Sequence, residues 1–320
     1  MSGSFARSLE LPNTAANFAL NIKRYDLADN YYTSYLKNLS KITPEDVLAV
    51  AKKYLRPNQI NIACVGNPSI TESLKKFSPS GKVELYDTYG RPLIEKSPAA
   101  AGVTAKSVIT AHYKAIGGVK SFSKLQSLQQ SGSVAMPGGM SLQFSQTNSY
   151  KKNKRGLRRS LSMSGHDILV NIATDSEGFV DEMGEITETL GTELQHIQWT
   201  ELDPIYMLNA SEKGITTELQ GVEEINSVKY HVINFSQDNV IKMTCYFDIE
   251  KQTLSMTKSI KDGPEGPTLT TIEYNKYIEY EKGMSFPIEI VTTVGPQTII
   301  TRLSYVTINP KVDSSIFNLD

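Results

Sequence analysis

The chain has 320 residues, of which 39% are hydrophobic and 21% charged, a length that suits one large domain or two of ordinary size. The 33 Lys and Arg residues nearly balance the 34 Asp and Glu residues, which excludes an overall basic field that would attract nucleic acid or anionic lipid. No apolar run approaches the ~20 residues of a membrane-spanning helix. The two cysteines are too few for a disulfide scaffold or a cysteine-based zinc site.

Residues 1–91 are predicted to be mainly helical, and their 12 Lys and Arg against 8 Asp and Glu give a net charge of +4. Helical spacing of apolar residues begins near Leu11, with no signal peptide before it, so we interpret the chain as a fragment whose native start need not be Met1. A later helix is marked by Thr43 as its N-cap and Pro44 at its first position. Residues 60–66 are predicted to form one buried strand that ends at a turn.

Residues 92–106 are predicted to be a linker, because they combine prolines with a run of small residues. The second domain, residues 107–320, begins with a helix that ends at Gly117 and Gly118. Short strands at even spacing follow, with a helical interruption at about 184–210. This pattern predicts an α+β chain: a mostly helical first domain, then a large curved antiparallel sheet, an incomplete barrel with one or two helices covering its concave face.

Three segments within residues 1–88 resemble the closing segment of an insulinase/pitrilysin-like zinc metallopeptidase: YDLADNYY from residue 25, ITPEDVLAVAKKYL from residue 42 and INIACVG from residue 60. In the zinc motif of that family, His-x-x-Glu-His, two His bind the metal and the Glu activates water. That motif is absent here. The resemblance therefore implies a non-catalytic C-terminal portion, which supports peptide hydrolysis by an upstream zinc domain or partner subunit. We expect no catalytic residue, metal ligand or cofactor in this chain, and zinc only in the parent peptidase.

The second domain resembles the periplasmic lipoprotein-carrier and outer-membrane lipoprotein-sorting group. The resemblance lies in AHYKAIGGVKSF from residue 111, GMSFPIEI from residue 283 and LSYVTINPKVDSSIF from residue 303. A curved sheet in that group wraps apolar helices and holds an acyl chain. The resemblance implies an alternative function, a lipid- or lipopeptide-binding β module with the peptidase-like part as scaffold. Together the two resemblances imply a periplasmic or outer-membrane-associated location.

Two sets of side chains are candidates for binding. The helical interruption holds the only Trp with apolar neighbours that either close a cavity under the sheet or fill the core: Trp199, Leu202, Ile205 and Tyr206. Six cations either dock on lipid headgroups or an acidic partner, or form the solvated face of a hairpin. They are Lys151, Lys152, Lys154, Arg155, Arg158 and Arg159. Core packing and a solvated hairpin are the preferred interpretations.

Other polar residues give no specific site. The acidic residues within 175–188 lack the spacing of an EF-hand loop, so we expect a solvated loop there. Cys64 and Cys245 lie in predicted apolar strands and are expected to be buried free thiols. The histidines have no partners at metal-ligand spacing and are expected to be structural. They are His112, His166, His196 and His231.

Overall fold

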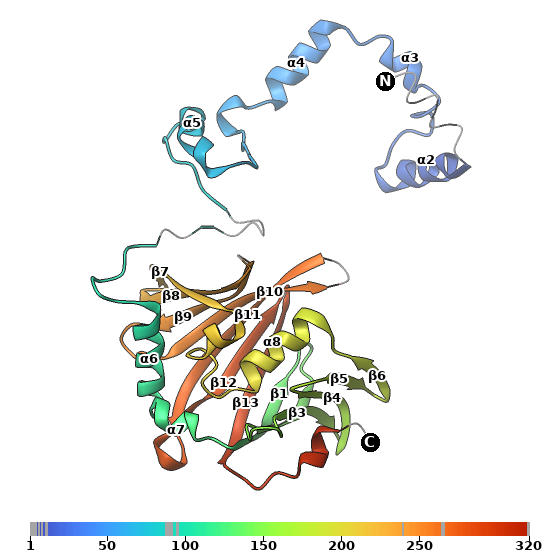
Figure 1. Ribbon diagram of the computed structural model, residues 1–320. Coiled ribbons are helices and arrows are strands. Elements are labelled where there is room, and N and C mark those ends of the chain that lie inside the picture. Colours follow the sequence, from blue (N-terminus) through green and yellow to red (C-terminus); the bar gives the residue numbers. More distant parts are fainter. Residues whose placement is uncertain are drawn as a thin grey trace. The chain divides into compact units, whose positions relative to one another are not determined.

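The chain consists of two compact units, Met1–Glu84 and Leu85–Asp320. The structure is a computed structural model, and it describes residues 5, 7, 9, 12–86, 92–93, 96–238, 240–263 and 266–318. The first unit is helical, and the second combines helices with a large sheet (Figure 1). An α+β chain is therefore confirmed.

The first unit consists of short helices. These are α2 (Pro12–Arg24), α3 (Tyr35–Leu39), α4 (Pro44–Tyr54) and α5 (Thr71–Leu74), with 3-10 turns at Pro57–Gln59, Pro68–Ile70 and Lys75–Phe77. The start of α4 is the one predicted from the sequence. The Thr43 hydroxyl accepts the Asp46 backbone N–H at 3.2 Å, and the Asp46 carboxylate accepts the Thr43 backbone N–H at 3.0 Å. This reciprocal capping fixes the first turn of the helix.

The strand predicted at residues 60–66 is wrong. These residues form neither strand nor helix, and no strand occurs among the described residues of the first unit. A strand needs a neighbour to accept and donate its backbone hydrogen bonds, and this unit offers none. The side chains of Ile60, Ile62 and Val65 are more than half exposed. Cys64 is exposed as well, so its predicted burial is also wrong.

The second unit is built on one antiparallel sheet of 13 strands, in the order β6-β5-β4-β3-β2-β1-β13-β12-β11-β10-β9-β8-β7. The first half is β1 (Ser127–Ala135), β2 (Ser141–Ser149), β3 (Gly156–Met163), β4 (His166–Thr174), β5 (Gly178–Glu182) and β6 (Glu185–Glu188). The second half is β7 (Thr216–Ile225), β8 (Val228–Gln237), β9 (Val240–Asp248), β10 (Leu254–Gly263), β11 (Gly266–Glu279), β12 (Ser285–Val294) and β13 (Gln297–Ile308). β13 pairs with β1 and so joins the two halves.

The large antiparallel sheet is confirmed, but the incomplete barrel is not. The sheet is not closed, because β6 and β7 are its two edges and do not pair with each other, and it is not strongly curled. The β7 edge is covered at one point: Ser97 and Val222 exchange two backbone hydrogen bonds of 2.8 Å. The bridge pairs the backbone groups of Val222 that would otherwise be open at this edge.

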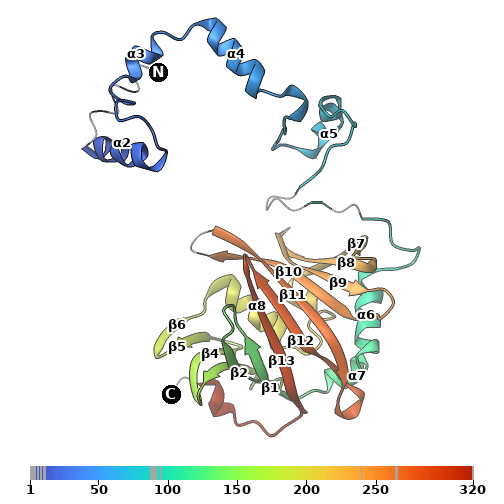
Figure 2. The same cartoon turned by 180° about the vertical axis from the view of Figure 1, so that it is seen from behind.

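Helices cover one face of the sheet. They are α6 (Ala105–Ala115), α7 (Val119–Ser123) and α8 (Gly191–Glu201), with a 3-10 turn at Ala210–Lys213. Figure 1 shows α8 in front of the strands, and Figure 2, from behind, shows β10–β13 in front. The opposite face of β3 and β4 is covered by the 3-10 turn Ser314–Phe317, whose Phe317 packs on Val170 and Ile172.

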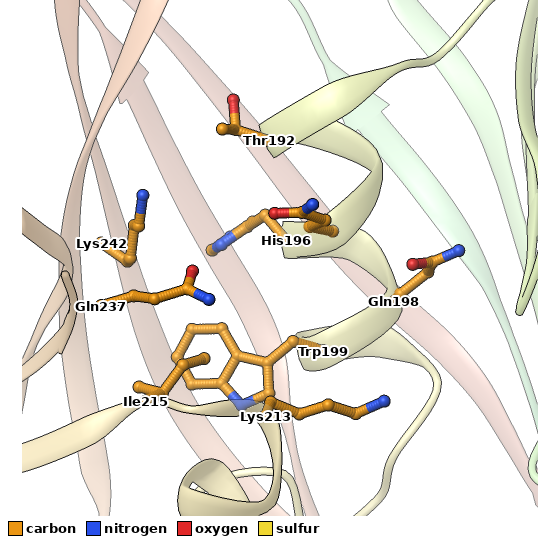
Figure 3. A pocket seen from close by; sticks show the side chains of 9 residues that line it. Thr192, His196, Gln198, Trp199, Lys213, Ile215, Gln237 and Lys242 are labelled. Carbon is orange, nitrogen blue, oxygen red and sulfur yellow. The ribbon is translucent and has the colours of Figure 1, made fainter.

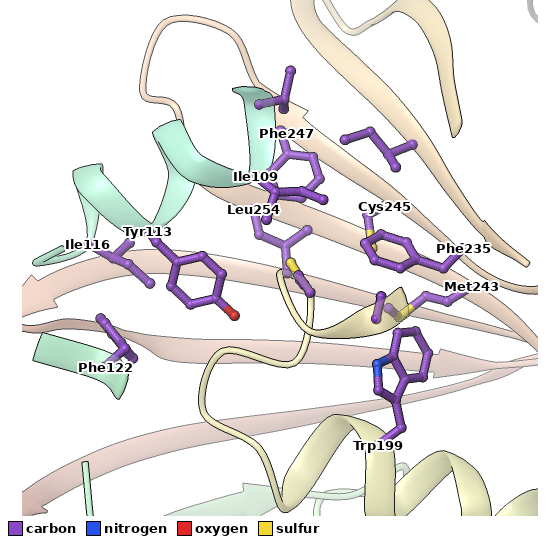
Figure 4. Close-up of a cluster of buried hydrophobic side chains, with 14 of the residues drawn as sticks. Ile109, Tyr113, Ile116, Phe122, Trp199, Phe235, Met243, Cys245, Phe247 and Leu254 are labelled. Carbon is purple, nitrogen blue, oxygen red and sulfur yellow. The ribbon is translucent and has the colours of Figure 1, made fainter. Parts of the chain in front are cut away.

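One continuous apolar core fills the space between the helices and the sheet. Ile109 and Tyr113 of α6, Trp199 of α8 and Phe235 of β8 all belong to it (Figure 4). Cys245 of β9 lies in the same core with no exposed surface, so its predicted burial is confirmed. The helical face of the sheet is therefore the apolar interior of this unit.

Candidate ligand pocket

Helix α8 is tied to the sheet by a polar network at its C-terminal end. Arg159 of β3 donates to the Glu201 carboxylate at 2.8 Å and to the Gln146 side-chain oxygen at 2.7 Å. Asn148 of β2 donates to the Glu201 backbone carbonyl at 2.9 Å and accepts from Gln146 at 2.9 Å. The Arg159 and Glu201 side chains are only about one-third exposed (35% and 32%), so this pair is less screened than a surface salt bridge.

Trp199 lies on the buried face of the same helix, where it packs into the core. Its indole is 4% exposed, and its N–H donates to the Tyr206 carbonyl at 3.3 Å. The rings of Tyr206 and Phe235 lie 5.5 and 5.6 Å from it, centroid to centroid. The indole also lines a pocket.

This pocket has a volume of about 180 Å³ and lies between α8, the end of β8 and the start of β9 (Figure 3). Trp199 and Ile215 supply its apolar surface, and both are buried. The remaining lining side chains are polar or cationic. They are Thr192, Gln195, His196, Gln198, Lys213, Gln237 and Lys242.

Lys242 reaches the pocket because of a β-bulge. Phe235 of β8 pairs with Met243 of β9, but the next residue, Ser236, pairs with Ile241, so Lys242 is the extra residue of the bulge. Met243 and Cys245 point into the core, and in a regular strand Lys242 would point to the opposite face. A bulge breaks this alternation and redirects a side chain. Lys242 therefore lines the cavity and is half-buried.

Lys213 approaches the pocket from the other side, at the end of the 3-10 turn. Gly214 follows it with a φ of +70°, a conformation that suits glycine, and its N–H donates to Ser211 at 3.1 Å. Ile215 then donates its N–H to the carbonyl of Ala210 at 3.0 Å, and Ala210 is buried in the core. These contacts fix the backbone on both sides of Lys213.

The charged residues that line the pocket have one sign. Its nine lining residues include two lysines and no carboxylate. Within the described part of the chain, neither Lys213 nor Lys242 forms an ion pair. Lys213 is exposed and Lys242 is half-buried, so only Lys242 is partly removed from water without a counter-charge. The charge of the lining is therefore positive.

The core beneath the pocket carries no charge from its phenols. Burial raises the pKa of Tyr274 to about 12 and raises the pKa of Tyr113, Tyr206 and Tyr277 further. All four phenols are thus protonated at neutral pH. The interior that continues from Trp199 is apolar with neutral hydroxyls.

The four residues predicted to close a cavity occupy different places. Only Trp199 lines the pocket. Leu202 packs in a separate small cluster with Leu157 and Ala173, while Ile205 and Tyr206 pack against the main core. Sequence reasoning missed the two lysines of the pocket.

The six cations predicted as a docking patch do not share one face. Arg158 and Arg159 are neighbours on β3 and point to opposite faces: Arg158 pairs with Asp167 at 2.9 Å, whereas Arg159 pairs with Glu201 on the helical side. Arg155 lies 3.9 Å from Asp175. The other three are exposed in the turn between β2 and β3. They are Lys151, Lys152 and Lys154.

The rest of the described chain was expected to hold no metal site, and it contains one further cavity. In the residues that the structure describes, no three His, Cys, Asp or Glu side chains gather where they could hold a metal ion. None of the described helices is long and apolar enough to cross a membrane. A second cavity, also about 180 Å³, lies between α6 and β8–β9, and it is lined by His231 and the Asp248 carboxylate. That carboxylate disfavours an anion there.

Comparison with known proteins finds similarity of fold. No family model matches the chain, and neither does any curated protein. A DUF1329 family protein from Desulfovibrio piger is 8% identical with a TM-score of 0.48, over 67% of this chain and 97% of that one. A LolA superfamily protein from Nitrosomonas europaea is 12% identical with a TM-score of 0.45, over 68% and 99%. A putative outer membrane lipoprotein-sorting protein domain from Vibrio parahaemolyticus is 7% identical with a TM-score of 0.46, over 67% and 97%.

These similarities agree with the lipoprotein-sorting resemblance of the second domain, as a likeness of fold alone. None of them supports the peptidase resemblance of residues 1–88. Because the identities and TM-scores are low, the ligand of this chain has to be argued from its own residues.

Proposed function

We propose that the second unit binds an amphiphile, either a lipid or a lipid-bearing peptide, with the apolar part beside Trp199 and the polar part at the pocket mouth. The observation that carries this proposal is the pocket itself. Its apolar wall, Trp199 and Ile215, adjoins the continuous core, while its other lining residues are polar or cationic. Ligand sites of this kind combine an apolar surface with a few polar groups that orient the ligand.

The volume limits what enters without rearrangement. A cavity of about 150 Å³ holds a benzene molecule, so 180 Å³ suits one ring or a short alkyl segment. Pockets for larger ligands begin near ~300 Å³. A full acyl chain therefore requires the Trp199 indole to move and the core side chains beside it to repack.

The sequence resemblance to lipoprotein carriers supports the same proposal, and with it a location in the periplasm or at the outer membrane. Residues 1–91 are then a scaffold attached to the binding unit. The pocket lies wholly in the second unit, so it does not bear on the peptidase interpretation of residues 1–88.

A neutral probe with one alkyl chain tests the proposal. Monododecanoyl glycerol, kept below its micelle concentration, is titrated into the full chain while the emission of its single Trp is recorded. We expect a saturable shift with one site, because Trp199 borders the pocket. Gln195→Phe narrows the mouth and weakens binding about tenfold, or ~1.4 kcal/mol. The matched control Gln129→Phe, on the exposed surface of β1, leaves binding unchanged.

Two results would overturn the proposal. One is the absence of any saturable Trp199 response. The other is equal binding by the wild type and by Gln195→Phe, because the probe would then occupy another surface.

A further inference from the structure

We infer that the second cavity, between α6 and β8–β9, binds a small uncharged molecule through His231, whose Nε2–H donates to a carbonyl or hydroxyl oxygen of that molecule. This site is separate from the pocket beside Trp199 and does not depend on the amphiphile proposed there. The apolar side chains that line the cavity come from the start of α6 and the end of β9. They are Val103, Val108, Ala111, Phe247 and Ile249.

His231 lines the cavity from β8. It pairs with Phe247 of β9, and the residues two and four positions further along the strand, Ile233 and Phe235, belong to the core under the helices. The His231 side chain is half-buried, and burial lowers its pKa from the ordinary 6.5. At neutral pH the imidazole is therefore uncharged and carries one N–H.

The surroundings of the two ring nitrogens decide where that proton lies. Nδ1 is buried and has no hydrogen-bond partner. Among the described residues Nε2 has no partner either, but it keeps accessible surface. An orphaned N–H in a protein interior is rarer than an orphaned acceptor, so the proton belongs on Nε2. His231 thus presents an uncharged N–H donor at the cavity.

The other buried or half-buried polar groups of the lining are already paired. The Asp248 carboxylate accepts the backbone N–H groups of Glu250 and Lys251 at 2.9 Å each. The Ser107 hydroxyl, although exposed, donates to the Thr104 carbonyl at 2.8 Å and accepts the Thr104 N–H at 2.9 Å. A ligand of this cavity therefore needs one hydrogen-bonding group, directed at His231.

The lining also limits the class of ligand. The cavity has a volume of about 180 Å³, and about 150 Å³ holds a benzene molecule, so one six-membered ring fits against the apolar side chains. The N–H of His231 requires an oxygen acceptor on that ring. The Asp248 carboxylate disfavours an anion, and its two backbone donors already compensate its charge without a ligand cation. The ligand is therefore a small uncharged ring compound with one oxygen.

Two probes of one shape test the inference on the full chain: cyclohexanone, which has an acceptor oxygen, and methylenecyclohexane, which has none. Binding is followed by NMR of the chain labelled with ¹⁵N in its histidines. We expect cyclohexanone to saturate one site and to shift the Nε2 resonance of His231. In His231→Phe, which keeps a ring without the N–H, the affinity for cyclohexanone relative to methylenecyclohexane should fall about fivefold, the factor for one hydrogen bond.

Further variants assign the nitrogen and the cavity. His231→Gln places an amide N–H near the position of Nε2 and should recover most of the loss, whereas His231→Asn reaches only the position of Nδ1 and should not. Ala111→Leu fills the cavity and should weaken both probes at least tenfold. Ala115→Leu, at an exposed position of the same helix outside the cavity, is the matched control and should change nothing.

Four results would overturn the inference. If neither probe binds, or if both bind equally well to Ala111→Leu, the cavity is not their site. An unchanged ratio of the two affinities in His231→Phe would show that the imidazole makes no hydrogen bond to the ligand. Recovery by His231→Asn instead of His231→Gln would place the bond on Nδ1. Tighter binding of cyclohexylammonium than of cyclohexanone would show that the site prefers a cation.

Discussion

Replacing Trp199 by Ala tests whether the indole separates the pocket from the core. The side chain is 4% exposed, and an aromatic side chain buries ~150–250 Å². At about 25 cal/mol per Å², this corresponds to ~4–6 kcal/mol of transfer free energy, part of which the Ala methyl group retains. The hydrogen bond to the Tyr206 carbonyl contributes about 1 kcal/mol. We therefore expect a loss of about 3–5 kcal/mol in the free energy of unfolding, the usual cost of removing a buried Trp.

The loss is measured by urea denaturation followed by circular dichroism. Gln195→Ala, at an exposed position of the same helix, is the control and should change stability by less than about 0.5 kcal/mol. A loss below about 1 kcal/mol for Trp199→Ala would refute the packing described for this residue.

Chemical rescue distinguishes an opened pocket from general damage. The substitution extends the 180 Å³ pocket toward the ~300 Å³ at which ligand pockets begin. Added indole should bind this space and raise the urea midpoint of the Ala variant, because a ligand of the folded state stabilises it. The wild type should not respond. Equal effects of indole on both proteins would show that the cavity does not form.

Three further outcomes are expected. Burial lowers the pKa of His112 to about 4 from an ordinary 6.5, so the unfolded state binds the proton between these values. The free energy of unfolding should fall by up to about 3 kcal/mol as the pH drops from about 6.5 to 4. Over this range the urea midpoint should fall less in His112→Gln than in the exposed control His166→Gln. Equal falls of the midpoint in the two variants would contradict this. A thiol reagent should modify Cys64 rapidly and Cys245 only in urea, because Cys245 is fully buried and burial raises its thiol pKa. Rapid modification of both thiols without urea would refute that burial. Limited proteolysis of the full chain should cleave residues 12–84 first, because the apolar helix faces there are largely exposed, and a protected first unit would contradict the exposure.

The sheet could be predicted from the sequence because its strands carry local signals. Turn residues at even spacing mark the hairpins of the second unit, and the helix before them ends at two glycines with φ of +127° and +95°, as Gly117 and Gly118 suggest. The cap at Thr43 was equally local. Each of these features depends on residues close together in the chain.

The β5–β6 hairpin is missed: residues 178–182 lie in the stretch expected to be a solvated loop, and residues 185–188 lie in the expected helical interruption. β6 reads Glu-Ile-Thr-Glu, and all four residues are exposed, so no apolar alternation marks it. The turn itself places Met183 and Gly184 at positive φ, of +52° and +93°. A glycine after a non-glycine residue is a common pair, and it becomes a hairpin signal only with recognisable strands on both sides.

Whether a strand forms also depends on distant partners. Residues 60–66 have strand-forming composition, yet nothing in the first unit pairs with them. Apolar residues of the same types in β8 are buried because β7 and β9 flank that strand. Composition gives a segment its propensity for a strand, and the strand forms only where a neighbouring segment pairs with it.

The positions of the arginine and lysine side chains depend on distant parts of the chain in the same way. Arg158 and Arg159 are adjacent in a conspicuous basic run, and the pleat of β3 sends them to opposite faces. Lys213 and Lys242 are isolated in the sequence, and folding brings both to one pocket. For Lys242 this requires a bulge, which is a mismatch in the count of residues between two paired strands. The bulge can be recognised only when the register of β8 against β9 is known. The residues near 242 therefore give no sign that this cation lies beside Trp199.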